Sequence, residues 1–569
     1  MANPTADLSV YDLRGDKANW DGVGIFYVSW CVLWTVCLFS GMTFLWLNRH
    51  LPILKIRGLP LALGAIVLLH LYWILGQLTY AVGPTLPVVS AYTVQYFFMG
   101  IWFPLGIALF HASNLRFLHV AKLQRQFTSL ENRPFSRHHD GNTSTTLFRR
   151  IRALPYTSKV LLFIGCAMVL QVLLTIAMWI ACRKYHPAYG APGTGLTAET
   201  IHGQLRQLSR GWEWWPSVLW QVLWTWIVAP YLIWQAWDIR DTMGWRAQTI
   251  GCCVSNLHAT PMFLIALYVP AFEKINQYFS PSQWIHLSIL ILEILTIFVP
   301  TFEVIRLKIL RKKSATLNAE WEAFSFASSS AATATDRRRH LSLSLDEKCA
   351  VIDFSEEELG DRLLTMSALN HVLCENPDPL QEFSALRDFS GENIAFLIRV
   401  AKWKHSLMDE KLSEESRRDA YNQALWIYID FISPRDAKFP LNLSSQDLKF
   451  LENLFEQSAR DLCGEALVNP AIPFDVEQPS SRTKHQDPED RPEYIGPIPS
   501  QFDAFVFDKA QADVKYLVLT NTWPKFVTEM QLRRRSSCET GRSETTQSSQ
   551  ATLASRFSRR FSKLIQALI

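Results

Sequence analysis

The chain has 569 residues, of which 49% are apolar, 12% aromatic and 19% charged, and its mean hydropathy of +0.05 exceeds that of ordinary soluble proteins. The 56 basic and 52 acidic residues balance to a net charge of +4, which does not suggest a nucleic-acid partner. This composition excludes a disordered chain, a collagen-like fibre and a disulfide mini-protein. Apolar residues concentrate in the first ~310 positions and acidic runs lie beyond them, which also excludes a single soluble globule.

Seven apolar stretches follow residues 1–22, and each is long enough to cross a bilayer as a helix of about 20 residues. They are roughly 23–47, 59–80, 86–110, 160–182, 215–237, 248–270 and 284–305. The first starts too late in the chain, is too long and lacks the basic n-region of a cleaved signal peptide. We therefore expect a seven-helix transmembrane domain over residues 23–313.

The Lys and Arg residues between these stretches predict the orientation of the domain. One alternating set of loops, together with the end of the seventh stretch, carries nineteen of them, and the opposite set carries seven. This asymmetry places the N-terminus outside and the C-terminal half in the cytosol. A multi-pass protein, most simply of the plasma membrane, is predicted.

Three ionisable residues fall inside the apolar stretches: His70, His258 and Glu293. Such groups are costly in hydrocarbon and normally face a partner. They form either a ligand or proton site between the helices or an internal polar network that fixes helix packing. The ten cysteines show no C-x-x-C pair and no zinc-ligand spacing, so no metal or cofactor is expected.

Beyond the bundle, residues 314–360 are rich in Ser, Ala and Thr and read as a flexible linker. Ser342 and Ser344 are candidate kinase targets or plain solvated spacer. From about residue 360 the apolar residues take helical spacing, as in Ile394, Leu397 and Ile398, and no alternating strands occur. The expected fold is all-α throughout, with a proline-rich insertion over about 466–500.

Four short blocks of this half carry a resemblance. They are 379–396, which includes Phe-Ser-Gly-Glu-Asn-Ile-Ala-Phe from residue 389, then 424–432, 440–443 and 505–526. Their residues and their order are similar to the regulator of G-protein signalling (RGS) domain, over residues 361–530. Joined to seven spans, the chain resembles the seven-transmembrane RGS proteins of fungi and plants. The number of spans and the external N-terminus also resemble a G-protein-coupled receptor, but the usual Asp-Arg-Tyr and Asn-Pro-x-x-Tyr motifs are missing.

The resemblance implies a helical bundle whose loops grip the switch regions of an activated Gα subunit. It implies faster GTP hydrolysis by Gα without a catalytic group or cofactor from this chain, because a partner that prefers the transition-state arrangement lowers the barrier. Glu392 and Asn393 match the pair that touches the switches, and Asn442 matches the residue that reaches the catalytic Gln of Gα. Asn521 and Lys525 stand where Asp and Arg are usual, which changes charge and hydrogen-bond geometry.

The last segment, 531–569, is basic, and its final part places Phe557, Phe561 and Leu564 on one helical stripe. A basic amphipathic helix suits an anionic inner leaflet, and a disordered basic end is the alternative.

Three functions fit the sequence. The first is a membrane-bound GTPase activator for a Gα subunit. The second is a receptor for an unidentified extracellular ligand whose RGS-like domain only docks Gα. The third is a transporter with a regulatory cytosolic domain, which only Glu293 supports.

Overall fold

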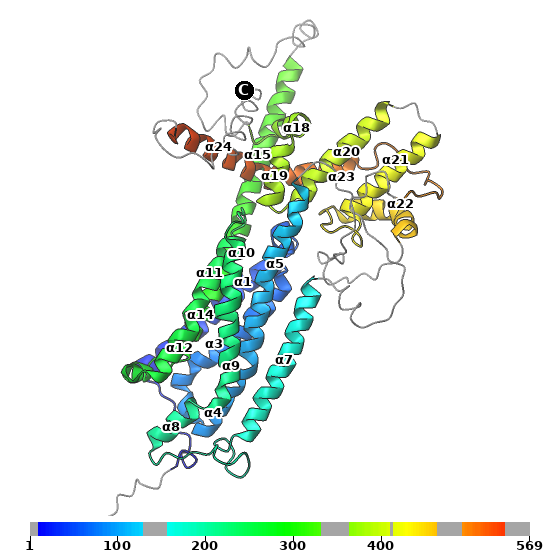
Figure 1. Cartoon of the computed structure of the whole chain (residues 1–569). Helices are drawn as coiled ribbons and strands as arrows, with labels where there is room; N and C mark the ends of the chain where they lie inside the picture. The colour runs from blue at the N-terminus through cyan, green and yellow to red at the C-terminus, as the bar shows by residue number, and fades with distance from the viewer. Residues whose placement is uncertain (1–8, 129–155, 332–362, 410–413, 464–491, 541–569) are drawn as a thin grey trace, which may run out of the picture. The chain divides into compact units, whose positions relative to one another are not determined.

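The computed structural model describes residues 9–128, 156–331, 363–409, 414–463 and 492–540 (Figure 1). The chain divides into two compact units, one formed by 1–120 and 145–303 and the other by 121–144 and 304–569. Each unit is described by itself below. The described residues contain helices and no strand, which confirms the predicted all-α class.

Among the described residues, seven helices are long and apolar enough to cross a membrane, which agrees with the predicted number of spans. Helices α1, α3 and α7 are continuous, whereas the other four spans are built from consecutive helical segments. The segments are α1 (Gly22–Leu47), α3 (Leu59–Ala81), α4 (Val88–Phe97), η2 (Phe98–Trp102), α5 (Phe103–Gln124), α7 (Tyr156–Ala181), α9 (Trp215–Val222), η5 (Leu223–Val228), α10 (Ala229–Ala236), α11 (Trp245–Leu257), α12 (Ala259–Tyr268), α14 (Gln283–Glu293), η7 (Ile294–Phe298) and α15 (Val299–Ala331).

Shorter helices lie between the spans: α2 (Pro52–Arg57), η1 (Gly83–Thr85), η3 (Arg125–Phe127), α8 (Ile201–Ser209), η4 (Trp212–Trp214), η6 (Pro270–Phe272) and α13 (Glu273–Asn276). Helix α1 begins where the Asp21 carboxylate accepts the Gly24 N–H at 2.7 Å, because that bond satisfies one of the free donors of the first turn. The other oxygen of Asp21 accepts a hydrogen bond from the hydroxyl of Tyr80 at 2.7 Å. This bond connects the start of α1 to the end of α3.

Three spans contain a π-helical turn: η2, η5 and η7. A π turn holds one extra residue and leaves a carbonyl out of the regular ladder. The carbonyl oxygen of Gly100 in η2 accepts bonds from Gln171 Nε2 at 3.1 Å and Thr175 Oγ1 at 3.4 Å. Side chains of α7 therefore satisfy a backbone group that lipid cannot satisfy.

Gly58 joins α2 to α3 with a left-handed φ of +65°, a conformation that costs a residue with a Cβ about 1–2 kcal/mol. A Cβ at this position would also lie 2.9 Å from Arg116 Cδ. The guanidinium of Arg116 donates to the Ile56 carbonyl at 3.0 Å, so the turn and α5 are locked at the same place. Glycine is required here by both conformation and space.

The second unit contains the end of α5 with η3, and α15 from Val304 onward. Its other helices follow residue 363: α18 (Met366–Glu375), α19 (Asp378–Leu386), α20 (Gly391–Asp409), α21 (Glu414–Ile427), η8 (Tyr428–Ile432), α22 (Ser445–Cys463), α23 (Asp508–Leu517), η10 (Val518–Thr522) and α24 (Trp523–Thr540). The predicted stripe of Ile394, Leu397 and Ile398 faces its core, since the first two side chains are buried and the third is partly buried. Tyr421 and Val514 are buried in the same core.

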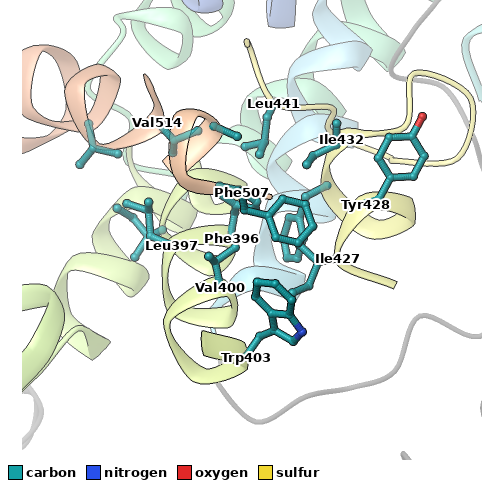
Figure 2. Close-up of a cluster of buried hydrophobic side chains, with 14 of the residues drawn as sticks. Phe396, Leu397, Val400, Trp403, Ile427, Tyr428, Ile432, Leu441, Phe507 and Val514 are labelled. Carbon is teal, nitrogen blue, oxygen red and sulfur yellow. The ribbon is translucent and has the colours of Figure 1, made fainter. Parts of the chain in front are cut away.

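Aromatic rings from α20, α21, α22 and the start of α23 form the centre of this core (Figure 2). Phe507 lies 5.4 Å from the ring of Trp403 and stacks on Phe455 at 5.8 Å between ring centroids. The indole N–H of Trp403 donates to the Ala420 carbonyl at 3.0 Å, so the one polar atom of this large side chain is satisfied. Four segments distant in sequence are thereby held in one bundle.

Parts of three predicted segments differ from expectation. Helix α15 continues to Ala331, so the first part of the expected linker, 314–331, is helical rather than flexible. Helix α24 continues to Thr540, so the basic tail begins as a helix. Residues 492–500 of the proline-rich insertion pack on the core, because the Tyr494 N–H donates to Asn422 Oδ1 at 2.8 Å. The remainders of the linker (with Ser342 and Ser344), of the insertion and of the tail lie outside the described residues.

Candidate functional site

Glu392 and Asn393 lie on the first turn of α20, directly after a strained loop. Phe389 in this loop has a φ of +48°, which is rare for a bulky residue. The loop is held because its N–H groups return to α19, Asp388 to the Phe383 carbonyl at 3.2 Å and Ser390 to the Ser384 carbonyl at 2.9 Å. The buried ring of Phe389 anchors the bend, which sets the position of the Glu-Asn pair.

Both members of the pair already have partners within the second unit. Asn393 is 6% exposed, and its amide donates to Glu392 Oε1 at 3.3 Å. The other oxygen of Glu392 accepts the amide of Gln124, a residue of the same unit, at 2.9 Å. Gln124 Oε1 in turn accepts the Gly391 N–H at 3.1 Å. Nothing in the sequence near Glu392 signals this partner, because 268 positions separate the two residues.

Lys525, on the first turn of α24, lies in a buried polar network rather than on an open surface. Its ammonium lies 2.7 Å from Asp388 Oδ1, and the two side chains are 11% and 0% exposed. Asp388 Oδ2 accepts the hydroxyls of Thr522 at 2.7 Å and Ser390 at 2.9 Å. Asp388 thus joins the loop before α20 to the junction of η10 and α24. Sequence reasoning missed Asp388, although it stands four residues before Glu392.

Asn521 lies in the π turn η10, next to this network. Its Oδ1 is buried and accepts no hydrogen bond from the described part of the chain. Its neighbour Trp523 is fixed, because the indole N–H donates to the Leu363 carbonyl at 2.6 Å. Asn521 is therefore held on a rigid turn with one acceptor unused.

Asn442 lies on a third segment, between η8 and α22, and its side chain is exposed. Its neighbour Leu441 is buried, and the Leu441 N–H donates to the Phe431 carbonyl at 2.8 Å. Within the described residues no hydrogen bond engages the Asn442 amide. A rigidly anchored backbone therefore presents a free amide, which both donates and accepts.

The structure thus joins four of the five predicted residues through Asp388 and the α20 turn and leaves Asn442 on its own loop. The exposed Asn442 amide suits hydrogen bonding to another polypeptide, whereas Asn393 and Lys525 are nearly buried and already have partners. In the described residues no cluster of three or more His, Cys, Asp or Glu side chains is placed to hold a metal ion.

In the first unit, His70 and Glu293 form a closed buried cluster. His70 Nδ1 lies 2.9 Å from Glu293 Oε1, and Trp34 Nε1 donates to Glu293 Oε2 at 2.5 Å. The other ring nitrogen of His70 lies 3.1 Å from Thr35 Oγ1. The cluster joins α1, α3 and α14 and uses both oxygens and both nitrogens of the pair, which favours the packing interpretation over a ligand site.

His258 does not join that cluster. It lies between α11 and α12, where the sixth span breaks before Pro261, and its Nε2 is buried without a hydrogen-bond partner in the described residues. The sequence could not separate His258 from the pair, because hydropathy reports depth along a helix and not the direction that a side chain takes.

Comparison of the chain with protein-family models, with curated proteins and with solved structures finds no match in any of the three.

Proposed function

We propose that this chain is a membrane-bound regulator of G-protein signalling that activates GTP hydrolysis by a Gα subunit. The observation that carries the proposal is the Asp388 network. It fixes the turns bearing Glu392, Asn393, Asn521 and Lys525 to one another, while Asn442 is presented freely from an anchored loop.

The mechanism needs no nucleophile, base or cofactor from this chain. Gα itself supplies the Gln that orients water and an Arg that spreads the developing charge. A rigid surface that fits the switch regions best in their transition-state arrangement lowers the barrier by that difference in binding energy. The pre-formed loops suit this role because little conformational entropy is lost on binding.

The seven spans would keep the domain at the membrane and raise its effective concentration near membrane-anchored Gα. In this arrangement the N-terminus would lie outside the cell and the RGS-like unit in the cytosol, at the plasma membrane. The basic tail, 531–569, would add contact with the anionic inner leaflet.

The test is single-turnover GTP hydrolysis by purified Gα subunits mixed with the full-length protein in lipid nanodiscs. We expect acceleration, and tighter binding to Gα with GDP–aluminium fluoride than with GDP or a GTP analogue. Asn442→Ala should lower the acceleration at least tenfold, since hot-spot truncations cost about 2 kcal/mol, and should leave the thermal midpoint unchanged because the side chain is exposed. Equal binding to all three nucleotide forms would reject the proposal.

One observation favours the second function, a receptor that docks Gα without activating it. Lys525 is neutralised by Asp388, and Asn521 carries no charge, so this surface offers Gα less charge than an Asp-Arg pair. That function predicts Gα binding with unchanged hydrolysis, in the wild type and in Asn442→Ala alike.

A further inference from the structure

A surface groove lies in the second unit, beside the start of α22. Its floor is apolar and buried, formed by Leu451 of α22, Val506 in the turn before α23, and Ala510 of α23. Its volume is about 160 Å³. A cavity of about 150 Å³ holds one benzene ring. The groove is thus sized for one aromatic or large aliphatic side chain.

Two exposed phenyl rings form its walls. Phe450, within α22, is 44% exposed, and Phe505, in the turn before α23, is 67% exposed. Exposed rings that converge on one apolar groove mark an interaction surface more often than scattered exposed side chains do. The pair is fixed in place, because Leu451 and Val506, the neighbours of the two rings, are anchored in the core.

The rim carries unpaired negative charge. Ser444 caps α22 by accepting the Asp447 N–H at 3.2 Å, and its hydroxyl donates to Asp447 Oδ2 at 2.5 Å. Asp503 Oδ1 accepts the Phe505 N–H at 2.9 Å. Neither carboxylate forms an ion pair within the described residues, and Lys509 supplies one opposing charge. A basic residue beside the inserted side chain would complement this rim.

We infer that this groove is a second contact for Gα, which inserts one apolar side chain flanked by a Lys or Arg. The inference rests on the proposed function above. Gα is the occupant because the groove continues the surface assigned to it: Asp447 follows the exposed Asn442 by five residues, at the start of the helix that the Asn442 loop enters.

The experiment measures binding of full-length protein in nanodiscs to Gα with GDP–aluminium fluoride. Phe450→Ser with Phe505→Ser should weaken binding about tenfold or more, as loss of buried aromatic anchors does. Ile495→Ser is the matched control, because Ile495 is 83% exposed and does not line the groove. Asp447→Lys with Asp503→Lys should slow association most at low salt. Thermal midpoints of the Phe and Ile variants should equal that of the wild type, because these side chains are exposed.

The outcomes separate this inference from the proposed function. A wild type that binds every nucleotide form equally rejects the proposed function itself. A wild type that prefers the fluoride form, weakened by Asn442→Ala but not by the paired Phe substitutions, overturns the groove alone. Unchanged Gα affinity with altered self-association or altered vesicle binding would also overturn it, and would assign the groove to a second copy or to lipid.

Discussion

Lys525 Nζ lies 2.7 Å from Asp388 Oδ1, so a carboxylate from the loop before α20 neutralises the ammonium on the first turn of α24. The pair joins segments 137 positions apart, and both side chains are nearly shielded from water. Its role is to keep two of the candidate Gα-binding turns in one fixed relation. A residue that looked like a surface contact is therefore a positioning residue.

Breaking this pair should be costly. Asp388→Asn leaves Lys525 buried without a counter-charge, so we expect about 3 kcal/mol of lost stability in the second unit, read as a lower thermal midpoint. Adding Lys525→Met should recover part of the loss, because the two effects share one interaction. Arg460→Ala is the control, since its pair with Glu456 is exposed and should contribute less than about 1 kcal/mol. If Lys525→Met lowered the thermal midpoint further when added to Asp388→Asn, the energetic coupling of the two side chains would be contradicted.

The buried cluster of the first unit should act on stability and not on signalling. Glu293→Ala removes the acceptor of Trp34 and the partner of His70, with an expected loss of about 2 kcal/mol. Adding His70→Ala to Glu293→Ala should lower the stability little further, because the contact between the two side chains is already lost. Gα hydrolysis rates below the melting range should stay unchanged. A proton or solute flux that Glu293→Gln abolishes would instead restore the transporter hypothesis.

Two glycines near the start of α3 should respond in opposite directions to alanine. Gly58→Ala should destabilise by about 1–2 kcal/mol from the left-handed φ, and further because its Cβ meets Arg116. Gly64→Ala should stabilise by up to about 1 kcal/mol, because its Cβ meets nothing within 4 Å and alanine favours the helix. The thermal midpoints of the two variants, compared with wild type, measure the difference. A midpoint for Gly58→Ala at or above that of the wild type would contradict the assigned turn.

Alkaline pH should destabilise the second unit through Tyr428. Burial and a 2.7 Å hydrogen bond to Glu456 raise the pKa of this phenol above its usual value near 10. A raised folded-state pKa contributes stability that is complete below about pH 10 and falls as pH rises above it. Tyr428→Phe should lose about 1 kcal/mol at neutral pH but show a shallower decline between pH 9 and 11 in thermal midpoint. Parallel decline in both proteins would exclude Tyr428 as the source.

The sequence predicted the spans and the helical class well because both depend on local properties. A run of apolar residues is membrane-length whatever it packs against, and the spacing of Ile394, Leu397 and Tyr421 sets a helix face directly. The error at 314–331 arose because Ser and Ala residues, which read as a linker, also continue a helix that has already begun.

The candidate site was less accessible to sequence reasoning. Asp388 and Gln124 acquire their roles only through contacts across 137 and 268 positions. His258 was grouped with Glu293 by depth, and the direction of its side chain depends on the break between α11 and α12. Only the placement of Asn442 on an exposed loop needed no tertiary contact.

The π turn η5 gives the fifth span an unusual tolerance of chain length. One residue of Leu223–Val228 is surplus to a regular α-helix, so its deletion would let α9 run straight into α10. Because the π turn already absorbs this residue, Ala229, Leu232 and Ala236 would keep their shielded orientation. A deletion within the regular α10 would instead rotate everything after it by about 100°, the angle of one helical step. The same lost codon is therefore far less disruptive in η5 than a few positions later.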